Sequence, residues 1–402
     1  MYDAIKDELY RSYNLSALND DELRHLIRRL YSERTRSFAQ TEDERKDAVN
    51  YIFSSIRGFG ILDLLLGDEA ISEIMVNSYD EVYLEKNGQI SKSKVKFEST
   101  KEMEDVIQRI VNRAGREVNQ ANPIVDTRLD GGERVNIVLP PIAIGSPVIT
   151  IRRFPKDRIT MQDLISFGSI TREAADFLKQ LVRAKYNIFI SGGTSSGKTT
   201  FLNALTDFIP KTERIITIED SAELQITEID NLVRMETRNA NTSGAGEVTM
   251  QDLIKTSLRM RPERIIVGEV RGKEALDMLN AMNTVHDGSL STGHANSSYD
   301  MLRRLETMVM QGSYGLPLSA VRRDIASSVD VIIHLGKVDG KHRSVVSIDE
   351  VVGIEQDTIC LNSIFQLSEG TLIPTGNELT HTFKLREYGG MEHLEGSKTE
   401  IW

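Results

Sequence analysis

The chain has 402 residues, of which 40% are hydrophobic and 27% charged, a composition typical of a soluble globular protein with two or three domains. Its net charge of −11 provides no overall field that favours nucleic acid, so direct binding to DNA or RNA is not expected. No apolar run approaches the roughly 20 residues that a transmembrane helix needs, the polar start has no features of a secretory signal, and the single cysteine excludes an intrachain disulfide and a cysteine-ligated zinc. We therefore expect a cytoplasmic protein without a transmembrane segment.

Residues 1–58 are predicted to form a helical segment. Asn19 and Glu22 fit a capping box, and apolar residues follow them at helical spacing. Charged residues fill the opposite face, a pattern that is typical of a docking element and equally of a solvated helix pair.

Residues 59–153 show a strand pattern with one helix, which predicts a compact α+β domain of PAS-like type. A hairpin is expected to turn at Asn87-Gly88, and a helix is expected from Met103 to Arg113. The expected strands lie near Ile74, over 82–85 and 89–90, and over 134–139 and 148–152.

Residues 154–165 contain Pro155 and break this pattern, so they are the expected linker to a second domain over residues 166–402. Strand-like runs alternate there with helical patterns, which predicts an α/β domain with a mainly parallel sheet covered by helices. Ligands of such sheets bind at the carboxyl ends of the strands. Residues 360–402 are expected to add short strands and an irregular acidic tail. The predicted strands of the sheet are 188–191, 214–218, 264–268, 289–293, 329–335 and 345–351.

A phosphate-binding loop follows the first of these strands. Gly192, Gly197, Lys198 and Thr199 satisfy the pattern G-x-x-x-x-G-K-[ST], with an apolar run before the loop and a helical pattern after it. Backbone N–H groups of such a loop surround phosphate oxygens, the lysine reaches the β- and γ-phosphates, and the threonine hydroxyl binds Mg²⁺. The predicted nucleotide-binding residues are Gly192, Gly193, Thr194, Ser195, Ser196, Gly197, Lys198, Thr199 and Thr200.

Three other predicted strands end in acidic or imidazole side chains. Glu219 and Asp220 follow one strand, Glu269 follows the second and His294 ends the third. Each alone has a structural explanation, since acids after strands often cap helices and a single histidine is more often structural. Together with the phosphate loop they fill the roles of metal ligand, base for the attacking water and γ-phosphate sensor. The predicted Mg²⁺ ligands are Thr199, Asp220 and Glu269.

Several arginines are candidates for neutralising the charge that develops on the γ-phosphate during transfer. Arg128, Arg134, Arg152 and Arg153 belong to the α+β domain, from which they could move onto or off the nucleotide. About half of them are expected to be ordinary salt-bridge partners of nearby acids. Arg271, two residues after Glu269, is a candidate for the same phosphate region or for a subunit interface.

Four of these motifs, in this order, resemble the ATPase superfamily that powers type II and type IV secretion and type IV pili. The resemblance covers about residues 55–370. The sequence around the motifs is similar to the CpaF type associated with Flp/Tad pili. Members that act in type II secretion often carry a four-cysteine zinc element, which a chain with one cysteine lacks. The superfamily motifs are GGTSSGKTT (192–200), TIEDSAEL (217–224), RPERIIVGEVRGKEALDML (261–279) and GSLSTGHANS (288–297). The CpaF-like segments are EIMVN (73–77), TRLDGGERVN (127–136), ITIRRF (149–154) and NTVHDGSLSTGHANS (283–297).

This resemblance implies a homohexameric ring in which a RecA-like ATPase domain and the N-terminal domain hold ATP and Mg²⁺ between them. Carried onto this sequence, it makes Lys198 and Thr199 the ligands of phosphate and Mg²⁺. Glu219 is the preferred base for the attacking water, Glu269 organises Mg²⁺ through water, and His294 senses the γ-phosphate. Which glutamate acts as the base stays open.

The leading hypothesis is a motor that drives Flp/Tad-type pilus assembly by ATP hydrolysis. It would sit at the cytoplasmic face of the inner membrane and work with an inner-membrane pilus or secretion platform protein. One alternative is a type IV secretion or conjugation ATPase, and another is a RecA-like nucleic-acid motor, against which the acidic net charge weighs. A further alternative is a nucleotide-dependent docking protein with negligible turnover. His286 and Asp287, just before the histidine motif, receive no predicted role.

Overall fold

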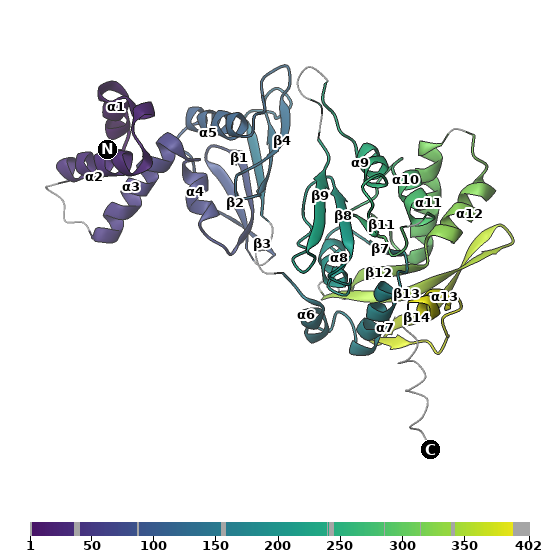
Figure 1. Ribbon diagram of the computed structural model, residues 1–402. Coiled ribbons are helices and arrows are strands. Elements are labelled where there is room, and N and C mark those ends of the chain that lie inside the picture. The colour runs from purple at the N-terminus through teal and green to yellow at the C-terminus, as the bar shows by residue number, and fades with distance from the viewer. Residues whose placement is uncertain are drawn as a thin grey trace. The chain divides into compact units, whose positions relative to one another are not determined.

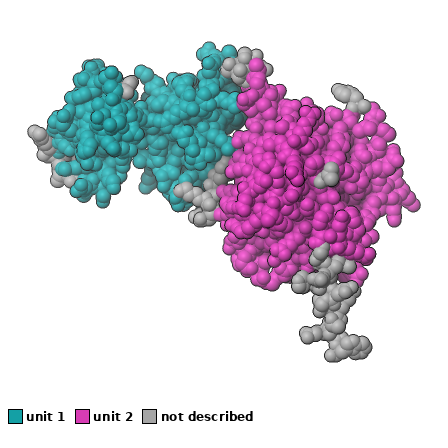
Figure 2. Space-filling view, in the orientation of Figure 1, with its two compact units in different colours: residues 1–156 teal, residues 157–402 magenta. Residues whose placement is uncertain are grey.

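The described part of the chain divides into two compact units, residues 1–156 and residues 157–402 (Figure 2). None of the helices within the described ranges is long and apolar enough to cross a membrane. The computed structural model (Figure 1) describes residues 2–35, 41–86, 88–153, 158–238, 240, 245–284, 286–313, 315–338 and 342–388.

The first unit begins with three helices, α1 (Tyr2–Ser12), α2 (Asp20–Arg34) and α3 (Glu42–Arg57). The predicted capping box at the start of α2 is confirmed, because the Glu22 N–H donates to Asn19 Oδ1 and the Asn19 N–H donates to Glu22 Oε2, each at 2.9 Å. The apolar faces of the three helices form a small core of their own, which includes Ile5, Leu9, Leu23, Ile27 and Ile52.

The rest of this unit is an antiparallel sheet with the order β3-β2-β1-β6-β5-β4, whose core also contains residues of α4 (Ile61–Leu66) and α5 (Thr100–Arg113). The expected hairpin is present as the β2–β3 pair, although Asn87 lies outside the described residues. Strand β4 was not predicted, because Asp126 and Arg128 interrupt its apolar pattern. The strands are β1 (Ile71–Ser78), β2 (Glu81–Lys86), β3 (Gln89–Lys92), β4 (Ile124–Arg128), β5 (Arg134–Val138) and β6 (Val148–Arg152).

The second unit contains a nine-stranded sheet with the order β15-β14-β13-β12-β7-β11-β10-β8-β9. The six strands from β12 to β9 in this order are parallel, which confirms the expected α/β class. The strands are β7 (Ile188–Gly192), β8 (Arg214–Glu219), β9 (Asn231–Glu236), β10 (Arg264–Val267), β11 (Leu290–His294), β12 (Val331–Val338), β13 (His342–Glu355), β14 (Thr358–Ser368) and β15 (Thr371–Pro374).

Strands β13 to β15 pair antiparallel, so the predicted strand over 345–351 lies in the antiparallel part of this mainly parallel sheet. Only three residues separate β12 from β13, and a parallel pair needs a crossover of about a dozen residues or more. The short strands expected after residue 360 are present as most of β14 and as β15.

Helices cover both faces of this sheet, and strand β7 is buried between two apolar cores. Ile188 and Ile190 of β7 face the core that contains residues of α7 and α8, whereas Phe189 faces the core of α9 to α12. Burial on both faces is usual for a central parallel strand. The helices are α6 (Met161–Ser166), α7 (Arg172–Arg183), α8 (Lys198–Thr206), α9 (Met250–Ser257), α10 (Ala275–Met282), α11 (Ser298–Gly312), α12 (Leu318–Ser328) and α13 (Phe383–Glu387).

The predicted linker, residues 154–165, has helical structure at its far end. Residues 154–157 lie outside the described part of the chain, and α6 begins at Met161. Thr160 and Asp163 form a capping box there, a local signal that makes the chain helical soon after Pro155.

Candidate active site

Residues 192–200 form the end of strand β7, a tight loop and the first turn of α8. Ser195 and Gly197 have positive φ angles of 57° and 93°, which turn the backbone of the loop sharply. A Cβ atom at Gly192 would lie 2.7 Å from the carbonyl oxygen of Leu335 on β12, so only glycine fits there. Gly193 has no atom within 4 Å of the position of a Cβ, and its neighbours up to Ser195 are exposed. The loop is therefore anchored at its base and open at its tip.

Lys198 folds back into this loop. Its side chain is buried, and Nζ donates to the carbonyl oxygens of Gly192 and Gly193, each at 3.1 Å. Nζ also lies 3.2 Å from Nδ1 of His294, at the end of the neighbouring strand β11. Burial lowers the pKa of Lys198. A cation held in this way, with backbone carbonyls as its partners, is ready to exchange them for phosphate oxygens.

His294 continues a chain of contacts that runs along the carboxyl ends of the strands. Its Nε2 lies 3.0 Å from Glu269 Oε1, and Arg271 donates to Glu269 Oε2 at 2.8 Å. The second nitrogen of the Arg271 fork lies 3.6 Å from Asp220. Burial is the main cause that lowers the pKa of His294, so the imidazole is neutral at pH 7. A neutral ring accepts from Lys198 at Nδ1, while the nearby Oε1 of Glu269 has no hydrogen-bond partner among the described residues.

Glu219 is the most deeply buried acid among these predicted site residues. Its Oε1 accepts the backbone N–H groups of Glu223 and Leu224, both at 2.8 Å. Its Oε2 is buried and has no hydrogen-bond partner among the described residues. Burial raises the pKa of Glu219 to about 7. A carboxylate with a pKa near the working pH and one oxygen unengaged by protein groups has the properties of a general base.

The strand ends place Glu219 beside the segment that carries Glu269. A Cβ atom at Gly268 would lie 3.0 Å from Cγ of Glu219, and the Gly268 N–H donates to the carbonyl of Ile218 at 2.8 Å. Thr292, on β11, donates to the carbonyl oxygen of Gly268 at 2.7 Å. Three neighbouring strands thus hold the predicted acids and the predicted histidine at one edge of the sheet.

The residues of this edge fit a nucleotide with Mg²⁺. The loop has an open tip, and the buried hydroxyl of Ser196 has no hydrogen-bond partner among the described residues. The described part of the chain contains no group of three or more His, Cys, Asp or Glu residues that could hold a metal by themselves. Mg²⁺ is usually held by one or two protein oxygens together with water and substrate phosphates. Of the predicted ligands, Thr199 is partly buried, Glu269 is bound by His294 and Arg271, and Asp220 is exposed beside Arg271.

Residues 56–363 match the protein family described as type II/IV secretion system protein. The chain belongs to this family. The curated relative conjugal transfer protein TrbB of Rhizobium radiobacter is 32% identical over 314 residues, covering 77% of this chain and 92% of TrbB. Type IV secretion system protein PtlH of Bordetella pertussis is 35% identical over 259 residues, covering 58% of this chain and 76% of PtlH. The predicted superfamily is therefore confirmed, and the CpaF type within it stays a prediction.

Solved structures support the fold of this type II/IV secretion system family member. The ATPase DotB of Yersinia pseudotuberculosis is 18% identical, with a TM-score of 0.52 over 74% of this chain and 78% of that one. The pilus retraction motor PilT with bound ADP is 16% identical, with a TM-score of 0.51 over 84% of this chain and 89% of that one. At such identities the likeness concerns the fold alone.

Three of the predicted arginines form a row across the sheet of the first unit. Arg128 pairs in register with Arg134 on β5, and Arg134 pairs with Arg152 on β6. Because register partners point to the same side, the three arginines share one face, opposite the buried Val135 and Ile151.

Arg153 lies on the neighbouring position and has partners within its own unit. Its Nη1 donates to the carbonyl oxygens of Asp68 at 2.5 Å and Ile71 at 3.4 Å. A guanidinium used in this way stabilises the turn before β1, so a nucleotide role for Arg153 is the weakest among the four predicted arginines.

Two neighbours of the site were missed in the sequence. Glu274 accepts the backbone N–H groups of Arg271 at 2.6 Å and Gly272 at 2.8 Å, which fixes the loop that carries Arg271. An acid three residues after Arg271 is a local signal that could have identified it. His334, in the middle of β12, contacts Ser191 Oγ through Nδ1 at 2.8 Å. No pattern in the sequence marks that contact, because it depends on the order of strands.

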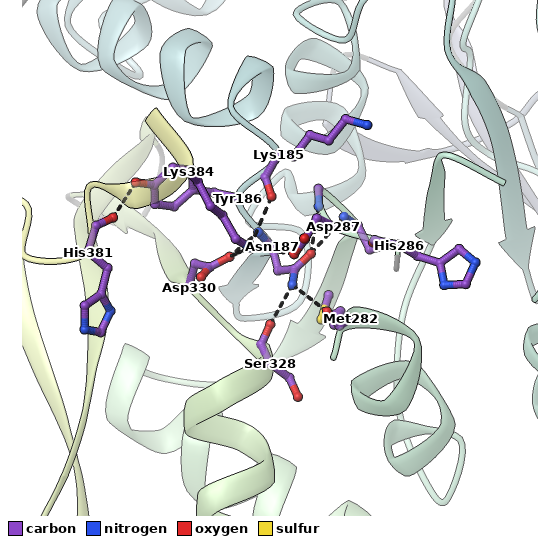
Figure 3. A network of polar contacts seen from close by, with 12 residues as sticks. Lys185, Tyr186, Asn187, Met282, His286, Asp287, Ser328, Asp330, His381 and Lys384 are labelled. Atoms are coloured by element: carbon purple, nitrogen blue, oxygen red, sulfur yellow. Dashed lines mark hydrogen bonds and ion pairs between the residues drawn. The ribbon is translucent and has the colours of Figure 1, made fainter. Parts of the chain in front are cut away.

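Asp287, which received no predicted role, belongs to a polar network at the amino end of β7 (Figure 3). Its Oδ1 lies 2.7 Å from Nζ of Lys384, and Oδ2 of Asp330 lies at the same distance from that nitrogen. The side chain of Asn187 accepts from the N–H groups of Gly288 and Ser289 and donates to the carbonyls of Met282 and Ser328. The phosphate loop follows the other end of the same strand, so this network is structural.

Proposed function

We propose that this chain is an ATP-hydrolysing motor subunit of a type IV secretion or conjugation machine. The proposal is supported by membership of the type II/IV secretion system family and by similarity to the conjugal transfer protein TrbB and the type IV secretion system protein PtlH. The observation that carries it is the chain of contacts from Lys198 through His294 to Glu269, which joins a phosphate-binding loop to an acid at the same sheet edge.

In the reaction, a water oxygen attacks the γ-phosphorus while the bond to the β,γ-bridging oxygen breaks, giving ADP and phosphate. Glu219 receives the proton of the attacking water, since its Oε2 is unengaged within the described part of the chain. Glu269 is the weaker candidate for the base because Arg271 donates to its Oε2, and its Oε1 lies 3.0 Å from Nε2 of His294. Thr199 and Glu269 would hold Mg²⁺, with Asp220 as a further candidate, and the metal supplies charge neutralisation at the phosphates.

Lys198 and His294 respond to the bound triphosphate. A γ-phosphate gives the Lys198 ammonium stronger partners than the carbonyl oxygens of Gly192 and Gly193. When Lys198 moves toward the phosphate, His294 loses its cationic neighbour and its contact with Glu269 changes. The histidine thereby reports the state of the nucleotide to the metal-binding acid.

Domain closure over the nucleotide is the proposed source of movement. The arginine row formed by Arg128, Arg134 and Arg152 supplies positive charge from the first unit, and a nucleotide that binds the closed form more tightly shifts the population toward closure. We further propose that six chains form a ring, so that these closures act on a common centre.

The proposed partner is a platform protein at the inner face of the cell membrane. The helices α1 to α3 form their own small core and present a charged surface, which suits a docking element. This would place the motor in the cytoplasm, peripherally associated with the membrane.

Flp/Tad-type pilus assembly is the second candidate function. This function is favoured by the segments 73–77, 127–136 and 149–154, because their sequences are similar to the CpaF type. Genes for prepilins beside the gene of this chain would favour the pilus motor, whereas genes for a conjugation pore would favour the first proposal.

Steady-state phosphate release by the full chain tests the proposed reaction. Lys198→Ala should abolish turnover and weaken ATP binding sharply, because it removes the cation that contacts the phosphates. Lys185→Ala, a lysine before β7 outside the loop, is the control and should keep activity. Normal turnover by the Lys198 variant would contradict the proposal.

A further inference from the structure

A cavity of about 430 Å³ lies beside His294 in the second unit. His294 and Arg271 belong both to its wall and to the chain of contacts described above. The rest of the wall comes mainly from α11, which contributes Asp300, Arg303 and Arg304. The cavity therefore adjoins the candidate site on the side of the histidine, and none of its α11 residues has a role in the proposed reaction.

The wall of this cavity carries the guanidinium groups of Arg303 and Arg304 besides that of Arg271. Neither Arg303 nor Arg304 forms an ion pair with any of the described residues, whereas Arg322 on the adjacent α12 pairs with both Glu306 and Asp357. Among the described residues that form the wall, Asp300 is the only acid. In a chain with a net charge of −11, a concave site with this excess of positive charge is suited to an anion.

The cavity connects the α11 arginines with the candidate site, because His294, Arg303 and Arg304 all line it. Lys198 Nζ lies 3.2 Å from the histidine ring, and the same ring faces the cavity. An anion that leaves Lys198 therefore meets His294 and then the guanidinium groups of α11.

We infer that this cavity is a transient site for the inorganic phosphate that hydrolysis releases, held by Arg303 and Arg304 before it reaches solvent. The inference rests on the proposed ATPase function. Guanidinium groups bind tetrahedral oxyanions through paired N–H donors, and the volume accommodates a phosphate with part of its hydration shell. The site is distinct from the phosphate loop, so ATP or its analogue and phosphate bind at the same time.

Equilibrium dialysis of labelled inorganic phosphate against the full chain tests this inference. The phosphate loop is first saturated with Mg²⁺ and a non-hydrolysable ATP analogue, whose binding is measured in the same cells. We expect phosphate to bind in the presence of the analogue. Arg303→Gln and Arg304→Gln should each weaken phosphate binding by about tenfold or more, because each removes a charge-assisted contact, while analogue affinity stays within about twofold.

Arg323→Gln is the matched control, since Arg323 is exposed on α12 and outside the cavity wall. It should leave phosphate binding unchanged. Competition between phosphate and the analogue for a single site would overturn the inference, as would phosphate binding that ignores both α11 substitutions or no binding at all. Phosphate would also fail to bind if the true occupant of the cavity were a carboxylate of a second chain.

The same experiment separates this inference from the proposed function. If the analogue binds and phosphate does not, only the cavity assignment fails. If the analogue does not bind, the proposed function fails, and phosphate binding by Lys198→Ala then tests the cavity alone. In that variant, binding that is lost on adding Arg304→Gln supports the cavity, and binding that persists contradicts it.

Discussion

Substitution of Lys384 tests how the C-terminal segment is attached to the second unit. Lys384, in α13, is 7% exposed as a side chain, and its Nζ lies 2.7 Å from both Asp287 and Asp330 and donates to the carbonyl oxygen of Lys185 at 3.3 Å (Figure 3). Lys384→Met keeps the length of the side chain and removes its charge. The two carboxylates then lose their shared cation.

The magnitude follows from the burial of each partner. Removing one member of a buried ion pair costs about 3–5 kcal/mol, because the remaining charge is left without compensation. The side chain of Asp330 is 19% exposed, whereas that of Asp287 is 38% exposed, so water compensates much of the second loss. We therefore expect the free energy of unfolding of the second unit to fall by about 3 kcal/mol, and its Tm by roughly 6 to 12 °C.

Thermal and urea unfolding of the full chain measure this loss. Lys211→Met is the matched control, because Lys211 pairs with Glu228 while 66% exposed, and such a pair contributes under about 1 kcal/mol. Burial raises the pKa of Asp330, so its uncompensated charge disappears as the pH falls through that raised value. The destabilisation by Lys384→Met should accordingly shrink at acidic pH. A variant as stable as the native chain at pH 7 would refute the reasoning.

Four further predictions concern the active site and the arginines. Glu219→Gln should keep nucleotide affinity and lose hydrolysis, measured as kcat and analogue Kd; retained kcat would return the base role to Glu269. Because burial raises the pKa of Glu219 to about 7, the native chain should lose roughly 3 kcal/mol of stability as pH rises from about 4.5 through 7, and the Gln variant should lack this slope in urea unfolding. Gly192→Ala should lower Tm and turnover together, because its Cβ would lie 2.7 Å from a carbonyl oxygen; unchanged values would mean that the loop is less tightly anchored. Arg134→Ala should slow hydrolysis and fold normally, whereas Arg153→Ala should chiefly lower Tm; equal activities would assign both to structure.

The phosphate loop and the strands around it could be predicted from the sequence because each depends on local patterns. An apolar run, a glycine-rich turn and a lysine at the start of a helix are contiguous, so β7 and α8 follow from them directly. The capping box of Asn19 and Glu22 is equally local. Glu219, Glu269 and His294 could be placed at one sheet edge because parallel strands end there.

The missed features depend on contacts between distant segments. Strands β4 and β9 have few buried residues, so no apolar pattern marked them. The antiparallel pairing that begins with β13 follows from the short connection between β12 and β13. The apolar pattern of these strands indicates a buried strand but not its direction. The bond from His334 to Ser191 requires β12 to lie beside β7, and the cavity beside His294 requires α11 to pack next to β11. Neither neighbour relation is encoded by spacing along the chain.

The side-chain amide of Asn187 bears on which part of the second unit could move during nucleotide turnover. Both of its donors and both acceptor positions are used inside the fold, and they tie the start of β7 to the segment before β11 and to the last residues of α10 and α12. A side chain with four hydrogen bonds resists displacement, so the sheet edge at the amino end of β7 is expected to stay fixed. Movement triggered by nucleotide turnover must then be expressed at the opposite rim, where glycines and a back-folded lysine leave the backbone room to adjust.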